Sequence, residues 1–265
     1  MIFLLILVFL ILIFVAVFIA ALICAVFLQL KRPVSRLYLR RSAESDYCPY
    51  DSIPDKLIFF ILQTEDKTFF SHPGYCIRDI KSAIRLNRNT GKIVTGGSTI
   101  TQQLIKNLYF DFYHNYFRKL TELFLTLHAE KKLNKKQILE LYLNIIYFGN
   151  GIYGITDAAG FYFNTDPSHL TENQMLILAC IPYAPTTANP LKHPEAFVRV
   201  RDKRVARMRF LGNISEDEAS RFISYPSSGL DPDIRQSDEA TEAFPDTIVM
   251  VNERFGIRSG WPPTS

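Results

Sequence analysis

The feature that most constrains this chain is an almost wholly apolar run at its N-terminus. Residues 2–30 are broken only by Gln29, and a helix needs about 20 apolar residues to cross a bilayer. A signal peptide would have a shorter apolar core with a charged segment before it. We therefore expect residues 1–30 to form a single-pass transmembrane anchor, with the rest of the chain on one side of the membrane.

The residues that follow the run are basic, and they make its orientation ambiguous. The cations are Lys31, Arg32, Arg36, Arg40 and Arg41. The positive-inside rule favours the cytoplasm for such a flank. The rule is statistical, and the same cations could instead contact anionic head groups. We expect residues 31–52 to form a juxtamembrane linker.

Length and composition exclude several classes of protein. A chain of 265 residues with a net charge of +4 suits one or two domains, and that charge is too small to indicate nucleic-acid binding. The four cysteines show no CxxC pair and no histidine at zinc spacing. We expect free thiols, with a Cys48–Cys76 disulfide as the alternative in an extracytoplasmic domain.

Beyond the linker the pattern is helical. No alternation of period two persists, so we expect a mainly α fold. Helix starts carry polar residues that can cap them. These starts are Ser52, Ser98 or Thr99, Asn134 with Gln137, Thr171 with Gln174, and Ser215 with Glu218. A last helix is expected over residues 245–255.

Two glutamates occupy opposed environments. Glu65 follows an apolar helix and precedes Asp66; burial and a neighbouring like charge both raise a carboxyl pKa, which suits a general base or acid. Glu122 follows Arg118 and Lys119 by four and three residues, a spacing that places both cations beside it and favours the ionised form. Such pairs are typical of chemistry at a sugar carbon, although each alone is more often a solvated helix end or a surface ion pair.

The stretch between the glutamates combines a glycine hinge with hydroxyls, amides and a lysine. In residues 96–107 the polar side chains Thr99, Gln102, Gln103 and Lys106 recur at spacings of three and four, so we expect them to share a helix face. Taken alone, this junction is more often plain helix capping. The chain has no HExxH, phosphate-binding loop, GxSxG or SxxK–KTG pattern.

Taken in order, these segments resemble the peptidoglycan glycosyltransferases, glycosyltransferase family 51, in their monofunctional transglycosylase form. The matching segments are 65–74 (EDKTFFSHPG), 96–103 (GGSTITQQ) continued by Lys106-Asn107, 118–122 (RKLTE), 138–144 (ILELYLN) and, more loosely, 204–208. The resemblance covers residues 53–211 and leaves 212–265 as a C-terminal extension. Cys76, His114 and Thr126 depart from the family pattern.

The resemblance implies a lysozyme-like, two-lobed helical fold that joins lipid II units into glycan strands and releases undecaprenyl pyrophosphate. It implies that Glu65 is the general base and that Glu122 either orients the nearby cations or helps to hold a divalent ion such as Mg²⁺. No organic cofactor is expected. The residues expected to bind substrate are Ser98, Thr99, Gln102, Gln103, Lys106, Asn107, Arg118, Lys119 and His72.

The same resemblance decides the location. The substrate is lipid-linked, so we expect the catalytic domain on the periplasmic face of the bacterial cytoplasmic membrane. Expected partners are lipid II, the growing glycan strand, membrane lipids and other wall-synthesis proteins. Two alternatives remain open: a lysozyme-like glycan hydrolase, and a catalytically weak scaffold for the wall-synthesis machinery.

Overall fold

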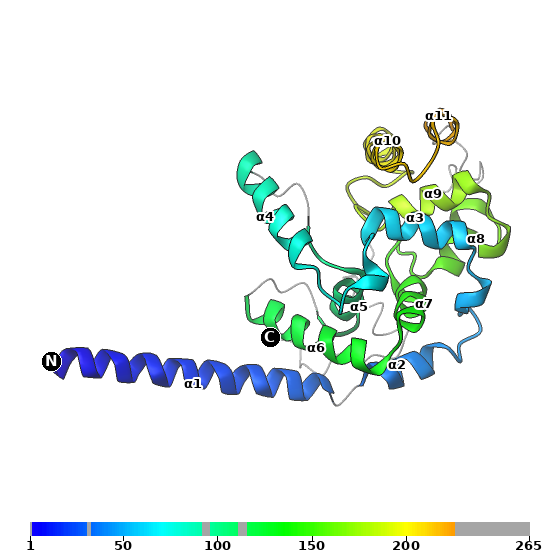
Figure 1. Ribbon diagram of the computed structural model, residues 1–265. Helices are drawn as coiled ribbons and strands as arrows, with labels where there is room; N and C mark the ends of the chain where they lie inside the picture. The colour runs from blue at the N-terminus through cyan, green and yellow to red at the C-terminus, as the bar shows by residue number, and fades with distance from the viewer. Residues whose placement is uncertain (1, 31–32, 92–95, 111–115, 226–265) are drawn as a thin grey trace.

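The computed structural model describes residues 2–30, 33–91, 96–110 and 116–225 (Figure 1). Within these residues the chain is helical, with no strand and one isolated bridge between Tyr147 and Tyr153. The expected mainly α class is therefore confirmed. The expected helix over 245–255 and the departure at His114 lie outside the described residues.

The residues that the structure describes form eleven α-helices joined by loops and short turns. They are α1 (Ile2–Leu30), α2 (Val34–Arg41), α3 (Asp55–Glu65), α4 (Ile77–Thr90), α5 (Ile100–Tyr109), α6 (Tyr116–Lys132), α7 (Lys135–Ile145), α8 (Ile155–Phe163), α9 (Glu172–Cys180), α10 (Pro194–Phe210) and α11 (Glu216–Ser224). Short 3-10 turns occupy Tyr50–Ser52, Phe69–Ser71 and Pro167–His169.

The helix α1 extends away from the body of the molecule and contacts α6 (Figure 1). Its described side chains are mostly exposed. Among the residues that the structure describes, no helix is long and apolar enough to cross a membrane. The anchor therefore stays a prediction.

The core forms where α3, α5, α7 and α9 meet. Every residue of α7 from Ile138 to Ile145 is buried, and so is every residue of α9 from Met175 to Cys180. Helices that are buried on all sides belong to the interior of a domain. The helix α3 packs against α9, and α5 packs against α7. Since α8 contacts both α7 and α9, these contacts together fix the end of α3 relative to the start of α5.

Side-chain capping explains where several of these helices begin. Four of them start with a capping box, in which the cap side chain accepts from a backbone N–H and the residue three positions on bonds back to the cap. The boxes are Thr99 with Gln102, Asn134 with Gln137, Thr171 with Gln174, and Ser215 with Glu218. The predicted Ser52 cap is wrong, because Ser52 ends a 3-10 turn and α3 begins after Pro54 without a side-chain cap.

The stretch predicted as a linker packs against the domain. The Cys48 N–H donates to Asn144 Oδ1, and Asn144 Nδ2 donates back to the Cys48 carbonyl, both at 2.8 Å. Arg41, only 4% exposed, pairs with Asp46 at 2.7 and 3.0 Å. Bidentate ion pairs and returned hydrogen bonds hold a segment in one place, so residues 34–48 form part of the folded body.

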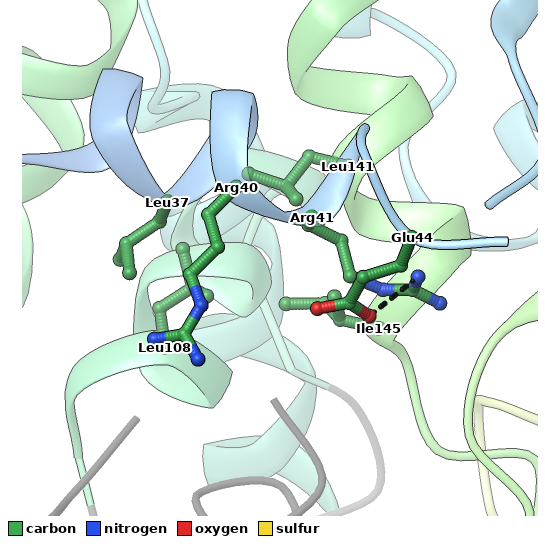
Figure 2. A pocket seen from close by; sticks show the side chains of 7 residues that line it. All are labelled: Leu37, Arg40, Arg41, Glu44, Leu108, Leu141 and Ile145. Carbon is green, nitrogen blue, oxygen red and sulfur yellow. Dashed lines mark ion pairs between the residues drawn. The ribbon is translucent and has the colours of Figure 1, made fainter. Parts of the chain in front are cut away.

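Figure 2 shows how this segment meets the helices beneath it. A small pocket lies between α2, α5 and α7, and an ion pair between Arg41 and Glu44 closes one side of it at 2.8 Å. The lining residues are Leu37, Arg40, Arg41, Glu44, Leu108, Leu141 and Ile145. The helices α5 and α7 also carry side chains of the candidate site. Packing of α2 against them therefore supports that site.

The described part of the predicted C-terminal extension is also folded. The Phe222 ring of α11 packs edge-on against Phe60 of α3 at 5.4 Å between centroids. Lys56 Nζ lies 2.9 Å from Glu218 Oε1. Thus α11 covers the outer side of the helix that carries Glu65.

All four cysteines are free thiols in this structure. Burial raises the pKa of Cys48 to about 11 and that of Cys180 to about 12. Such thiols stay protonated at neutral pH and are poor nucleophiles. The expectation of free thiols is met, and Cys48 and Cys180 are not suited to act as nucleophiles.

Candidate active site

Glu65 is the last residue of α3, and its two carboxyl oxygens differ. Oε2 accepts a hydrogen bond from Gln103 Nε2 at 2.9 Å. Oε1 is buried and has no hydrogen-bond partner among the described residues. Burial raises the pKa of Glu65, and the charge of Asp66 raises it further, against the opposing effects of Gln103 and nearby cations. A carboxyl with a raised pKa and one free oxygen is suited to accept a proton.

Gln103 is held from its other side by α7. The Tyr142 hydroxyl donates to Gln103 Oε1 at 3.3 Å. Tyr142 is fully buried, and burial raises its pKa well above the usual range, with Glu65 and Asp66 adding to the effect. The phenol therefore keeps its proton. Side chains of α3, α5 and α7 thus meet in one hydrogen-bonded row.

Lys106 lies one turn beyond Gln103 on α5. Burial lowers its pKa, and the neighbouring Arg118 and Lys119 lower it further, whereas Glu122 and Glu65 act in the opposite direction. The ammonium therefore interacts with both glutamates. It forms no ion pair or hydrogen bond with the described residues, so its charge is available to an anionic ligand.

Glu122 is the second carboxylate of the site, and it is paired with two cations, Arg118 and Lys119. Its side chain is 2% exposed and lies 2.5 Å from Lys119 Nζ and 3.4 Å from Arg118 Nη1. Lys119 Nζ also donates to Ser98 Oγ at 3.2 Å. A buried carboxylate that holds two cations can direct them towards a ligand. The predicted juxtaposition of Glu122 with Arg118 and Lys119 is confirmed.

The donor set around Glu122 does not fit a divalent metal ion. Both carboxylate oxygens already face Lys119 or Arg118. Among the described side chains, no group of three metal-binding residues comes together. Mg²⁺ prefers several oxygen ligands, and here the neighbours are nitrogen cations. No step of the reaction is therefore assigned to a metal at Glu122, and the Mg²⁺ expected from the sequence is untested.

His72 and Asp66 form an internal link between the turn after α3 and the start of α5. His72 Nε2 lies 2.9 and 3.0 Å from the Asp66 oxygens, and the Gly74 N–H donates to Nδ1 at 3.0 Å. Nδ1 is therefore the acceptor, and Nε2 carries the proton that faces Asp66. The Ile100 N–H donates to Asp66 Oδ2 at 3.0 Å. These contacts give His72 a positioning role, and its predicted contact with substrate stays untested.

Thr99 and Gln102 also use their polar atoms inside the protein. Thr99 Oγ1 donates to the Gly74 carbonyl at 2.6 Å and accepts from the Gln102 N–H at 3.2 Å. Gln102 Oε1 accepts from the Thr99 N–H at 3.1 Å. Two side chains predicted to bind substrate thus form the cap of α5. Their substrate contacts stay a prediction.

Gly74 can only be glycine in this setting. Its φ is +92°, and a Cβ there would come within 2.8 Å of both Glu130 Cγ and Thr126 Cγ2. Glu130 cannot move away easily, because it accepts from Thr101 Oγ1 at 2.5 Å and pairs with Lys135 at 2.8 Å. Backbone strain and overlap would both oppose a side chain. This close approach fixes the turn that carries His72.

The remaining predicted residues lie around this cluster. Ser98 is exposed and bonded to Lys119. Asn107 Nδ2 is buried and has no hydrogen-bond partner among the described residues. Of the departures from the family pattern, Cys76 is buried at the start of α4 and Thr126 is fully buried in α6. Asn107 therefore offers an unused donor close to Gln103 and Lys106 on α5.

Arg204 approaches Glu65 from α10. Its Nη1 donates to the Thr64 carbonyl at 2.5 Å, and its guanidinium lies 4.0 Å from the centre of the Tyr183 ring. Its charge opposes the rise in the pKa of Glu65. The sequence patterns do not predict this role for Arg204, nor the contacts of Asp66 and Tyr142. All three fall inside motif segments, but only the fold brings them together.

Taken together, the helical fold and the site define a domain suited to proton transfer beside a cluster of cations that can bind an anionic ligand. One glutamate is half-buried and has a buried oxygen without a partner among the described residues, and the other holds cations. The family model described as Transglycosylase matches residues 31–209. The chain belongs to this family, the peptidoglycan glycosyltransferase domains.

Curated relatives agree with this assignment. Penicillin-binding protein 4 of Bacillus subtilis is 36% identical over 208 residues, which are 78% of this chain and 32% of that protein. Penicillin-binding protein 1A of Aquifex aeolicus is 38% identical over 68% of this chain and 25% of its own length. A biosynthetic peptidoglycan transglycosylase of Chromobacterium violaceum is 41% identical over 51% of this chain and 59% of its own length.

The chain thus spans between a quarter and a third of the length of these two penicillin-binding proteins. A crystal structure of penicillin-binding protein 1A from Haemophilus influenzae is 28% identical and covers 48% of this chain and 16% of its own, with a TM-score of 0.33. The family assignment rests on the sequence matches.

Proposed function

We propose that this protein polymerises lipid II into glycan strands for the bacterial cell wall and releases undecaprenyl pyrophosphate. The observation that carries the proposal is the state of Glu65, whose Oε2 is bound by Gln103 while Oε1 is buried without a partner. The pKa of this carboxyl is raised by burial. Membership of the transglycosylase family supports a peptidoglycan substrate.

In the proposed reaction Glu65 Oε1 takes the proton of the acceptor sugar 4-hydroxyl. The deprotonated 4-hydroxyl oxygen of the acceptor sugar then attacks the anomeric carbon of the donor. The new glycosidic bond forms on the face opposite the leaving group. The bond between the anomeric carbon and the phosphate oxygen breaks, and its electron pair leaves with the pyrophosphate. The anomeric centre is inverted, as expected for a single displacement.

The leaving group requires charge neutralisation more than protonation. Lys106, Arg118 and Lys119 are the cations proposed to bind the pyrophosphate, and Glu122 would hold the last two in position. Fixed cations act where negative charge develops in the transition state. Asn107, with a donor that no described residue uses, would bind an adjacent sugar or phosphate oxygen.

The proposal also includes the location of the protein, its two-lobed fold and its partners. Residues 1–30 would anchor the protein in the cytoplasmic membrane, and the catalytic domain would face the periplasm, where a lipid-linked substrate is presented. The two-lobed, lysozyme-like arrangement and the partners in wall synthesis are proposed with it. The apolar run of 29 residues and the basic residues after it support the anchor.

The direct test is polymerisation of labelled lipid II by the purified full chain. Wild-type protein should yield glycan strands, and a Glu65→Gln variant should yield almost none. The matched control is Glu195→Gln, since Glu195 is 92% exposed on α10. Normal strand synthesis by Glu65→Gln would refute the assignment of the base.

The same assay separates the two alternatives. A glycan hydrolase would shorten finished strands and leave lipid II intact. A scaffold would bind other wall-synthesis proteins without measurable turnover. The three cations around Glu122 favour the transferase, because a hydrolase has no pyrophosphate to stabilise.

A further inference from the structure

We infer that Tyr142 is a positioning residue for the proposed base: its hydroxyl fixes the Gln103 amide so that the amide nitrogen faces Glu65. This inference rests on the proposed function, because it gives Glu65 the role of proton acceptor. Tyr142 lies in α7, whereas Glu65 ends α3 and Gln103 lies in α5.

The geometry links three elements in one row. The Tyr142 hydroxyl is 3.3 Å from Gln103 Oε1, and Gln103 Nε2 is 2.9 Å from Glu65 Oε2. The helix α5 packs directly against α7. Tyr142 is 0% exposed, so its hydroxyl cannot exchange this partner for bulk water. The hydrogen bond between Tyr142 and Gln103 is longer than the one between Gln103 and Glu65, so it is expected to be the weaker of the two.

The row has a direction because its two ends differ chemically. A glutamine amide can present either its carbonyl or its NH₂ group to Glu65. A carboxylate accepts hydrogen bonds, so the carbonyl orientation would place two acceptors against each other. The Tyr142 phenol keeps its proton and donates it to Gln103 Oε1, and within an amide only the carbonyl can accept that proton. Tyr142 and Glu65 therefore select the same orientation of Gln103 from opposite ends.

The consequence for Glu65 is a distinction between its two oxygens. Oε2 is held by the oriented amide, and Oε1 is left as the atom that can take a proton. Without the Tyr142 hydroxyl, the amide loses one of its two constraints. Its NH₂ group would then face Glu65 for less of the time, and the carboxylate would lose part of a stabilising hydrogen bond.

The first experiment compares Tyr142→Phe with wild type in the lipid II assay as a function of pH. We expect kcat to fall about fivefold, the effect of one ordinary hydrogen bond. KM should stay within about twofold, since Tyr142 reaches the base through Gln103 and not the substrate. The acid limb of the kcat profile should move to higher pH.

The matched control is Tyr162→Phe. Tyr162 is also fully buried and donates its hydroxyl to the Phe148 carbonyl at 2.7 Å, in a network with Asn150 and Asn189. Losing that hydroxyl removes a buried hydrogen bond that does not involve Glu65. Its acid limb should stay where it is in wild type. An equal shift in both variants would overturn the inference.

A double-mutant cycle tests whether Tyr142 acts through Gln103. In a Gln103→Met background the amide is absent, so adding Tyr142→Phe should leave kcat unchanged. A merely structural Tyr142 would lower kcat by the same factor in both backgrounds. That additive result would overturn the inference.

A final readout does not need turnover. The Glu65 carboxyl carbon can be followed by NMR against pH, with its signal assigned by its absence in Glu65→Gln. Tyr142→Phe should raise the titration midpoint, and an unchanged midpoint would overturn the inference. If wild type makes no glycan but the midpoint shifts, the proposed function fails and the inferred contact stands.

A second variant covers the case in which Tyr142→Phe does not fold. Replacing Tyr142 with 3-fluorotyrosine keeps the ring and the hydroxyl and makes the hydroxyl a stronger donor. The midpoint of Glu65 should then move to lower pH. No movement in a folded fluorotyrosine protein would overturn the inference.

Discussion

Gln103 Nε2 lies 2.9 Å from Glu65 Oε2, although the two residues are 38 positions apart in the chain. The contact joins the last residue of α3 to the second turn of α5. It leaves the other oxygen of Glu65 unpartnered among the described residues. One hydrogen bond thus joins the motif that begins at Glu65 directly to the motif that ends at Gln103.

The pH dependence of strand synthesis should reflect both titrating groups. Burial raises the pKa of Glu65, so the base becomes protonated and kcat falls at a pH above the usual glutamate range. Burial lowers the pKa of Lys106, so its charge is lost below the usual lysine range as pH rises. The kcat profile should be a bell narrower than ordinary side chains would give. An acid limb at about 4.3, the unperturbed value, would contradict the assignment.

Arg204→Met should shift the acid limb of the same profile to higher pH. Arg204 opposes the rise in the pKa of Glu65, so removing its charge lets that pKa rise further. Arg204→Lys keeps a charge and should give a smaller shift. Arg199→Met is the control on the same helix, since Arg199 is 72% exposed. Identical profiles for all variants would show that Arg204 serves only the backbone of Thr64.

Lys106→Met should lower kcat by about a hundredfold, the usual cost of losing one group that stabilises transition-state charge. The fold should persist, because no described residue bonds to the Lys106 ammonium; circular dichroism and a thermal melt would check this. Lys203→Met, at an exposed position of α10, is the control. Unchanged turnover in a folded Lys106→Met protein would remove Lys106 from the leaving-group site.

Chelation tests the metal prediction. The cations that face Glu122 leave it no free oxygen for Mg²⁺, so strand synthesis should persist in excess EDTA. The measurement is the initial rate with EDTA and after Mg²⁺ is restored. Abolished synthesis that returns with Mg²⁺ would show that substrate oxygens complete a metal site that the protein alone does not form.

Phe222→Ala should destabilise the domain by about 3 kcal/mol, the usual cost of truncating a buried phenylalanine. Phe222 is 2% exposed and packs edge-on against Phe60. Its neighbour Ile223 is 44% exposed, and Ile223→Ala should cost no more than about 0.5 kcal/mol. Denaturant unfolding of both variants measures the difference. Equal stabilities would mean that α11 does not support α3.

Local features were predictable from the sequence because their causes are local. Asn134 with Gln137 and Thr171 with Gln174 mark helix starts by residue type and spacing alone, and both boxes form as expected. The pairing of Glu122 with Arg118 likewise follows from a spacing of four on one helix.

Contacts between distant segments were not predictable in this way. The polar stretch before Cys48 looks like a linker by composition, yet Asn144 of α7 binds its backbone. Tyr142 has the same pattern as any buried helix residue, and only the packing of α5 on α7 brings it to Gln103. Residue type and spacing contain no record of which helices become neighbours.

Gln102 and Gln103 are adjacent in the sequence but make different contacts. Gln102 completes the capping box of α5, and Gln103 donates a hydrogen bond to Glu65. Their tolerance to mutation should therefore differ sharply. A glutamate at position 102 keeps a group that closes a capping box, whereas at position 103 it would set one carboxylate against another. A library randomised at both codons should retain acidic residues at the first and lose them at the second.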